Sequence, residues 1–89
     1  MTDILFLQTS GNYCEIRTPE HKLITKKGLV NILELLPEDI FVRVHRSYAV
    51  RIDAITRINT RGNEIEIGEH VIPLGRRYRD EFLDRLKII

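Results

Sequence analysis

Apolar and polar residues alternate along most of this chain, and the alternation is clearest over residues 41–50. Apolar residues stand at 42, 44, 48 and 50, with Arg43, His45 and Ser47 between them. This period-two pattern in β-branched and aromatic residues predicts a strand. Three hydrophilic residues run together at His45-Arg46-Ser47 and interrupt the pattern. We therefore expect the strand to bend there into a short exposed turn.

Six further segments have the composition of short strands: residues 4–7, 13–17, 22–26, 55–59, 64–67 and 70–74. Residues 4–7 are continuously apolar, which indicates a strand buried on both faces, and residues 8–12 have the composition of a hairpin turn. Pro73 cannot donate a hydrogen bond to a ladder, so the last strand is expected at a sheet edge or a bulge.

Two segments have helical rather than alternating spacing. Apolar residues at 29, 32, 33 and 36 predict a short helix that Pro37 ends, and so short a helix must be held on the sheet by its apolar side chains. A C-terminal helix is predicted from one apolar stripe, which comprises Tyr78, Phe82, Leu86 and Ile89. No helices alternate with the strands. The pattern therefore predicts a mainly β fold, with antiparallel strands in small sheets, one short middle helix and a C-terminal helix.

Length and composition limit the class of protein. Eighty-nine residues, 43% of them hydrophobic, suffice for one small domain over residues 1–89. No apolar run approaches the ~18 residues of a membrane-spanning helix, and the acidic start Met1–Asp3 is unlike a signal peptide, so we expect no membrane contact and a cytoplasmic location. The single cysteine, Cys14, excludes an internal disulfide and is expected to be a small buried residue.

The basic residues are unevenly distributed, although the net charge is only +1. Residues 1–40 contain four Lys or Arg against six Asp or Glu, whereas residues 41–61 contain five Arg against one acid. A second cluster comprises Arg76, Arg77 and Arg79. Arginine suits bidentate contacts with phosphate and guanine. The charge pattern alone leaves two interpretations open: a nucleic-acid-binding surface, or scattered solvated arginines on outer strand faces.

The sequence contains few of the motifs that indicate catalysis or metal binding. It has no Gly-rich phosphate loop, no H-E-x-x-H and no nucleophile elbow. The three histidines, at 21, 45 and 70, lack metal-ligand spacing. Ser47 lies two residues from His45, but neither an orienting acid nor an oxyanion hole is apparent. We expect no enzymatic activity, no catalytic or metal-binding residue and no cofactor.

Several motifs, in order along the whole chain, resemble the LytTR DNA-binding domain, the effector module of many bacterial response regulators. Residues 41–50 match the family's F-x-R-x-H-R/N-S-Y/F-x-V string throughout. The other matching segments are Asp3–Leu7 ("D-I-x-Y-I"), Ser10–Tyr13 ("x-G-N-Y"), the leucine helix Leu29–Leu36 with Pro37, and Ile72–Tyr78 ("I-P-V-S-R-R-Y"). The combination of ordered motifs is specific.

The resemblance implies that loops, rather than a recognition helix, enter successive major grooves of double-stranded DNA. Carried over by position, the family's base contacts fall on Asn12 or Tyr13, on Arg46 and on Arg76. Two of these three places coincide with the basic clusters. Arg46 and Arg76 are therefore candidates for contacts with base edges.

Other residues near these positions have candidate supporting roles. Arg43, Arg77 and Arg79 are expected to neutralise phosphates, which gives affinity and salt dependence rather than sequence choice. Ser47 and Asn12 each either bind phosphate or cap their own turns, and His45 either faces DNA or satisfies the turn backbone. Tyr48 and Tyr78 are expected in the core.

The resemblance also implies partners and shows two departures from the family pattern. It implies transcriptional regulation, with a receiver or sensor domain N-terminal to this chain and a possible homodimer on repeated half-sites. Most members begin with a further strand or two, so an open sheet edge is expected here. Arg51 stands where Asn is common, and Gly75 where Ser is common.

Two alternative functions remain open: a β-edge protein-interaction module without specific DNA binding, and an RNA or single-strand binder with exposed tyrosines.

Overall fold

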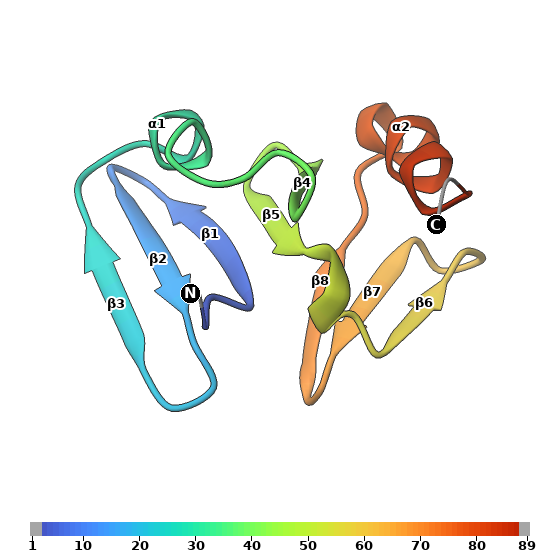
Figure 1. Cartoon of the computed structure of the whole chain (residues 1–89), viewed down its shortest axis with the longest axis horizontal. Coiled ribbons are helices and arrows are strands. Elements are labelled where there is room, and N and C mark those ends of the chain that lie inside the picture. The colour runs from blue at the N-terminus through green and yellow to red at the C-terminus, as the bar shows by residue number, and fades with distance from the viewer. Residues whose placement is uncertain (1–2, 88–89) are drawn as a thin grey trace.

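A computed structural model describes residues 3–87, which form two antiparallel sheets and two α helices (Figure 1). The strands are β1 (Phe6–Ser10), β2 (Tyr13–Arg17), β3 (Lys22–Thr25), β4 (Phe41–His45), β5 (Tyr48–Arg51), β6 (Arg57–Asn59), β7 (Glu64–Ile67) and β8 (His70–Pro73). The helices are α1 (Leu29–Leu33), the single 3-10 turn η1 (Ile52–Ala54) and α2 (Arg76–Lys87). The predicted mainly β architecture with a middle and a C-terminal helix is confirmed.

The five-stranded sheet has the order β3-β2-β1-β5-β4, and the three-stranded sheet has the order β6-β7-β8. Strand β1 is central because it pairs with β2 on one side and β5 on the other, so that Leu7 lies opposite both Ile16 and Ala49. Pro73 ends β8, an edge strand that pairs only with β7, as its missing N–H predicts. The two edge strands of the larger sheet are β3 and β4.

The expected short exposed turn is present at Arg46 and Ser47, but it reverses the chain, so the central stretch is a hairpin of two strands rather than one bent strand. Strand β4 pairs antiparallel with β5, and the chain reverses at Arg46 and Ser47. The register shifts between Arg43 and His45, which inserts one extra residue into β4 as a bulge. The alternation did not reveal the reversal because the turn contains none of the Gly or Asn residues that mark tight hairpins.

Several element boundaries differ from the prediction, and strands β3 and β8 each end one residue earlier than expected. Strand β1 begins at Phe6 and continues through Ser10, so polar residues expected in the turn instead pair with β2. Helix α1 ends at Leu33, before the end of its leucine stripe. Strand β6 begins at Arg57 rather than Ile55. Ile89, expected on the stripe of the last helix, lies outside the described residues.

Two hydrophobic clusters lie on opposite faces of the five-stranded sheet, because successive side chains of a strand point to opposite faces. Leu29 and Ile32 of α1 cover one face, where they pack with Leu7, Cys14 and Ala49. The other face packs against the three-stranded sheet and α2 in a larger cluster, which comprises Phe6, Val42, Val44, Val50, Ile65, Ile67, Ile72, Leu74 and Phe82. The larger sheet, which bears the hairpin turns, is thus packed on both faces.

Cys14 is fully buried in the α1 cluster, as its alternation predicts. Burial raises the pKa of its thiol above the ordinary value, and the negative charge of Glu15 acts in the same direction. A hydrogen bond with the Gln8 backbone opposes this shift without cancelling it. The thiol is therefore a packing group in the protonated form.

Helix α2 covers the β4 edge, whereas β3 is open. The Nη1 atom of Arg85 donates to the carbonyl oxygen of Phe41 at 3.1 Å, and its Nη2 atom donates to that of Glu38. The β4 edge is thereby closed to pairing with another chain. On β3, Leu23 and Ile24 are 56% and 62% exposed. Across residues 3–87, no helix is both long enough and apolar enough to span a bilayer.

Candidate nucleic-acid interface

The turn between β4 and β5 presents Arg46 on a backbone held by hydrogen bonds. Arg46 is exposed, while His45 and Ser47 are half-buried. The backbone N–H of Ser47 donates to Nδ1 of His45 at 3.0 Å. The His45 ring is thereby held against the backbone of its own turn. His45 was expected either to face DNA or to satisfy the turn backbone, and the structure shows the contact with the backbone.

The start of α2 lies directly beside this turn. The N–H of Gly75 donates to the carbonyl oxygen of Val44 at 2.7 Å. A Cβ atom at Gly75 would lie 3.4 Å from Cα of His45, so the two backbones approach closely. Arg76 and Arg77, both exposed, follow in the first turn of α2. Arg46 from the first basic cluster and Arg76 and Arg77 from the second thus share one surface hollow, which is also lined by His45, Gly75 and Tyr78.

The turn between β1 and β2 projects from the same end of the five-stranded sheet. Gln8 pairs with Tyr48, and the N–H of Thr9 donates to the carbonyl oxygen of Ser47 at 2.8 Å. Since β1 runs antiparallel to β5, the end of β1 lies near the start of β5. Beyond it, Asn12 is exposed and Tyr13 is 50% exposed. Three segments that are far apart in the sequence therefore meet at one end of the sheet.

Two of the three arginines predicted to contact phosphate, Arg43 and Arg79, instead make hydrogen bonds within the protein. Arg43 donates through Nε to the carbonyl oxygen of His45 at 3.2 Å and through Nη2 to that of Arg46. Its guanidinium carbon also lies 5.6 Å from the centre of the Tyr78 ring. Arg79 is turned toward the loop between β6 and β7, where its Nη2 donates to the carbonyl oxygen of Thr60 at 3.4 Å. Arg46, Arg76 and Arg77 are the exposed members of the candidate set of arginines.

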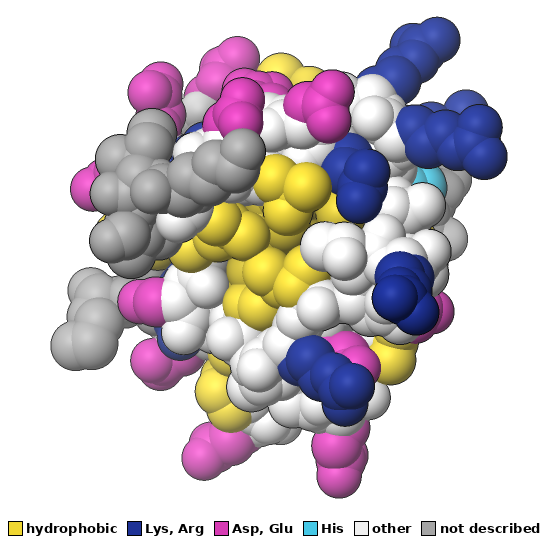
Figure 2. Space-filling view, turned by 90° about the vertical axis from the view of Figure 1, so that its right-hand side faces the viewer, with side chains coloured by type: hydrophobic (Ala, Val, Ile, Leu, Met, Phe, Trp, Pro, Cys, Tyr) yellow, Lys and Arg dark blue, Asp and Glu magenta, His cyan; other side chains and the backbone are white. Residues whose placement is uncertain are grey.

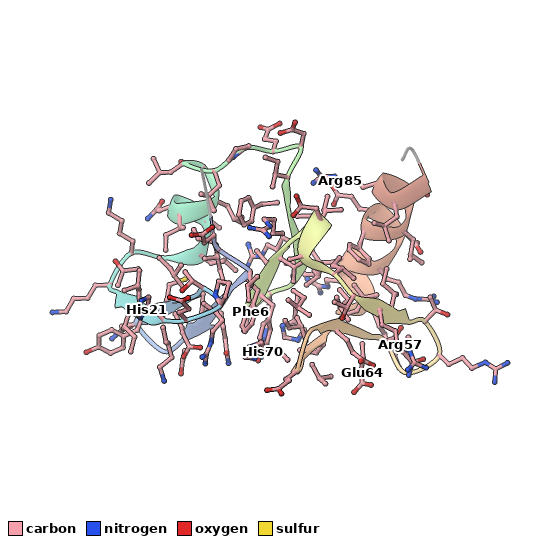
Figure 3. The ribbon with its side chains drawn as sticks, turned by 60° about the horizontal axis from the view of Figure 1, so that its bottom comes forward. Phe6, His21, Arg57, Glu64, His70 and Arg85 are labelled. Carbon is pink, nitrogen blue, oxygen red and sulfur yellow. The ribbon has the colours of Figure 1, made fainter. Side chains whose placement is uncertain are left out.

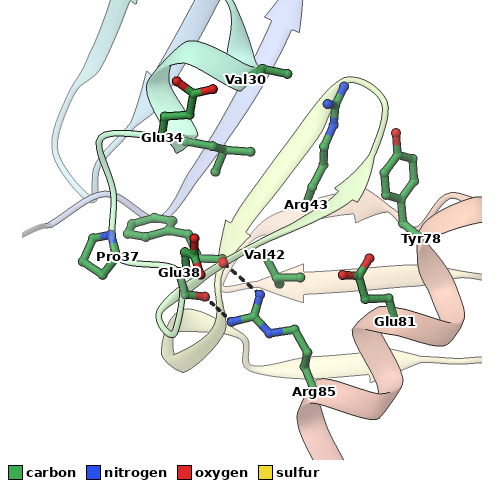
Figure 4. A pocket seen from close by; sticks show the side chains of 11 residues that line it. Val30, Glu34, Pro37, Glu38, Val42, Arg43, Tyr78, Glu81 and Arg85 are labelled. Carbon is green, nitrogen blue, oxygen red and sulfur yellow. Dashed lines mark hydrogen bonds between the residues drawn. The ribbon is translucent and has the colours of Figure 1, made fainter.

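Charge is segregated on the surface of the molecule. In the view of Figure 2, Lys and Arg side chains gather along one side, an apolar patch lies in the middle, and most Asp and Glu side chains lie elsewhere around the rim. A hollow over β4, between α1 and α2, has a different character from the basic one. Its lining combines three acids, Glu34, Glu38 and Glu81, with Arg43 and Arg85, and the two hydrogen bonds of Arg85 lie within it (Figure 4). Unlike the basic hollow, it contains more carboxylates than guanidinium groups.

The histidines are separated in space as well as in sequence. Figure 3 places His21 toward the outer part of the larger sheet, whereas His70 lies beside Phe6 at the junction of the sheets. The rings of Phe6 and His70 are 5.1 Å apart in an edge-to-face arrangement. Within residues 3–87, no group of three or more His, Cys, Asp or Glu side chains is placed to hold a metal ion.

Sequence reasoning missed the contacts that join the three segments. Nothing in the spacing indicated that Tyr78 would lie under Arg43, because the two are 35 positions apart in the sequence. The close approach of Gly75 to His45 was equally hidden. A detectable signal was present only for the turn itself, where three hydrophilic residues interrupt a strand pattern.

The fold and the site together define a small β domain that presents basic turns, rather than the face of a helix, at one end of a sheet. The sequence profile of the LytTr DNA-binding domain matches residues 1–87. The chain is 32% identical over 90 residues to the sensory transduction protein LytT of Bacillus subtilis (strain 168); the match covers 97% of this chain and 37% of that protein. The chain thus spans little more than a third of this relative.

A solved structure has the same fold. The LytTr DNA-binding domain of a response regulator from Bacillus cereus superposes with a TM-score of 0.86 at 24% identity, over 94% of this chain and 81% of that one. The chain therefore belongs to the LytTr DNA-binding domain family, as its motifs predicted. This is a family of DNA-binding domains in transcription regulation.

Proposed function

We propose that this chain binds double-stranded DNA sequence-specifically and reads major grooves through its three turn segments. The observation that carries the proposal is the convergence of the β1–β2 turn, the β4–β5 turn and the start of α2 at one end of the sheet. Their exposed side chains have complementary chemistry. Arg46 and Arg76 read base edges, Arg77 neutralises phosphate, and Asn12 with Tyr13 contacts the DNA from the first turn.

The biological setting belongs to the same proposal. We infer that the chain is the output domain of a bacterial two-component response regulator, with a receiver or sensor domain N-terminal to it. The match to only 37% of LytT supports this inference, because most of that protein lies outside the matched region. A second copy on a repeated half-site extends the contact to further grooves.

The test is selection of duplexes from a random pool, followed by fluorescence anisotropy across a range of salt concentrations. We expect a short enriched motif and a log–log salt slope of several units. Arg46→Ala and Arg76→Ala should each lose about 1–3 kcal/mol and relax the preference at a few base positions. Arg57→Ala is the matched control, because Arg57 is exposed on the edge strand β6 of the other sheet (Figure 3). The proposal fails if no motif is enriched and both variants bind like the wild type.

One observation favours a second function, that of a β-edge interaction module. The β3 edge is open, and Leu23 and Ile24 are more than half exposed on it. An extended segment of a partner could add to this edge through main-chain hydrogen bonds. Association of this kind is insensitive to salt, so the salt series described above separates the two functions. Single-strand stacking has less support, because Tyr48 and Tyr78 are half-buried and only Tyr13 is exposed.

A further inference from the structure

The β4–β5 turn lacks the backbone geometry of favoured two-residue hairpin turns. Those turns require a positive φ, usually at a glycine. The β1–β2 and β7–β8 turns meet the requirement with Gly11 (φ 61°) and Gly68 (φ 59°). Neither Arg46 nor Ser47 has a positive φ. The β4–β5 turn therefore depends on contacts other than its own backbone conformation.

Arg43 supplies those contacts from the strand that enters the turn. Its Nε and Nη2 atoms donate to two successive carbonyl oxygens, those of His45 and Arg46, across the bulge in β4. The guanidinium carbon lies over the Tyr78 ring, 5.6 Å from the ring centre. In Figure 4 the two side chains face one another across the gap between β4 and α2.

We propose that Arg43 is a positioning residue, which fixes the Arg46 backbone and sets the spacing between Arg46 and Arg76, rather than a phosphate ligand. This inference rests on the proposed DNA-binding function. The two carbonyl contacts fix the peptide planes on either side of Arg46, and hence the direction of its Cα–Cβ bond. Tyr78 lies in the first turn of α2, two residues from Arg76, so the same cation links both base-reading segments.

Physical chemistry explains why arginine is needed at this position. Two carbonyl oxygens and an aromatic face are satisfied together by a planar fork of N–H donors. A lysine would keep the charge but offers a compact ammonium, which cannot hold two successive carbonyls in one plane and stack on the ring. Arg43→Lys therefore separates the geometry of this side chain from its charge.

The experiment measures binding of the 89-residue chain to its selected duplex and to a scrambled duplex, across salt, for the wild type, Arg43→Lys and Arg43→Met. A positioning residue leaves the salt slope unchanged in both variants, while the ratio of specific to non-specific affinity falls about tenfold. A phosphate ligand gives the opposite pattern. Arg43→Met would then lower the slope by about 0.9 and weaken both duplexes equally, and Arg43→Lys would bind almost normally. That second pattern overturns the inference.

A double-mutant comparison with Arg46 measures an effect on specificity that a loss of stability alone would not produce. In an Arg46→Ala background, Arg43→Lys should cause a smaller further loss of specificity than it causes in the wild type, because one of the two side chains that it positions is absent. Additive losses would refute the inference. Tyr78→Phe, which keeps the ring, should retain specificity, whereas Tyr78→Leu should resemble Arg43→Lys. Circular dichroism identifies any variant that fails to fold. In that case the conservative variants, Arg43→Lys and Tyr78→Phe, decide whether Arg43 has a positioning role. A wild-type chain that selects no duplex refutes the proposed function itself, and this role with it.

Discussion

Replacing Arg85 with methionine is expected to loosen the attachment of α2 to the β4 edge. The substitution keeps an unbranched apolar stem and removes two hydrogen bonds, to the carbonyl oxygens of Phe41 and Glu38. Hydrogen bonds of a charged group contribute about 1.5–3 kcal/mol each when buried. Arg85 is only half-buried and Glu38 is exposed, so water replaces part of what is lost. We expect a total loss of about 1–2 kcal/mol in the free energy of unfolding.

Denaturant and thermal unfolding measure this loss. For a domain of this size, the expected change lowers the melting temperature by about 5–15 °C. Arg85→Lys keeps the charge with a single donor group and should fall between the wild type and Arg85→Met. Arg57→Met, at an exposed position on β6, should change stability by less than about 0.5 kcal/mol. If Arg85→Met is no less stable than Arg57→Met, the helix is held by its apolar face alone and this account of the β4 edge is wrong.

Three further outcomes follow from the core and the turns. The Cys14 thiol, buried and with a raised pKa, should react with a thiol reagent far more slowly in the native than in the denatured chain; equal rates would contradict its burial. Gly68→Ala should cost about 1 kcal/mol in chemical denaturation because φ is +59°, while Gly28→Ala, at φ −72°, should cost less; equal losses would contradict the turn conformation. Phe82→Ala should cost about 3–5 kcal/mol and leave much of the chain unfolded by circular dichroism, and a cooperative transition near that of the wild type would contradict its place in the core.

Local pattern identified the strands best where each strand is bounded by its own turn residues. Strands β2 and β7 have the predicted bounds, because Gly, Asn or Pro residues stand on either side of them. The reversal between β4 and β5 escaped prediction because side chains stabilise it, through Arg43 and His45, rather than residues with turn propensity. Contacts of that kind cannot be deduced from alternation.

The candidate site was predictable in its residues but not in its assembly. Arg46 and Arg76 stood out by charge and by resemblance to a family motif. Their shared hollow depends on the hydrogen bond between Gly75 and Val44, which joins positions 31 residues apart. Such long-range pairing follows from the packing of the whole sheet. For the same reason, the internal contacts of Arg43 and Arg79 were not foreseen, and both were expected on phosphate instead.

The β1–β2 turn is supported separately from the other two turn segments, which has a consequence for how such domains diversify. This turn ends a hairpin that packs under α1, whereas the β4–β5 turn and the start of α2 rest on the larger cluster that contains Phe82 and are joined by the contacts of Arg43. Asn12 is exposed and belongs to neither cluster, so a substitution there alters the first turn without repacking the others. Under the proposed function, evolution can change the part of a DNA site that contacts the β1–β2 turn while the part that contacts the linked β4–β5 turn and α2 stays the same.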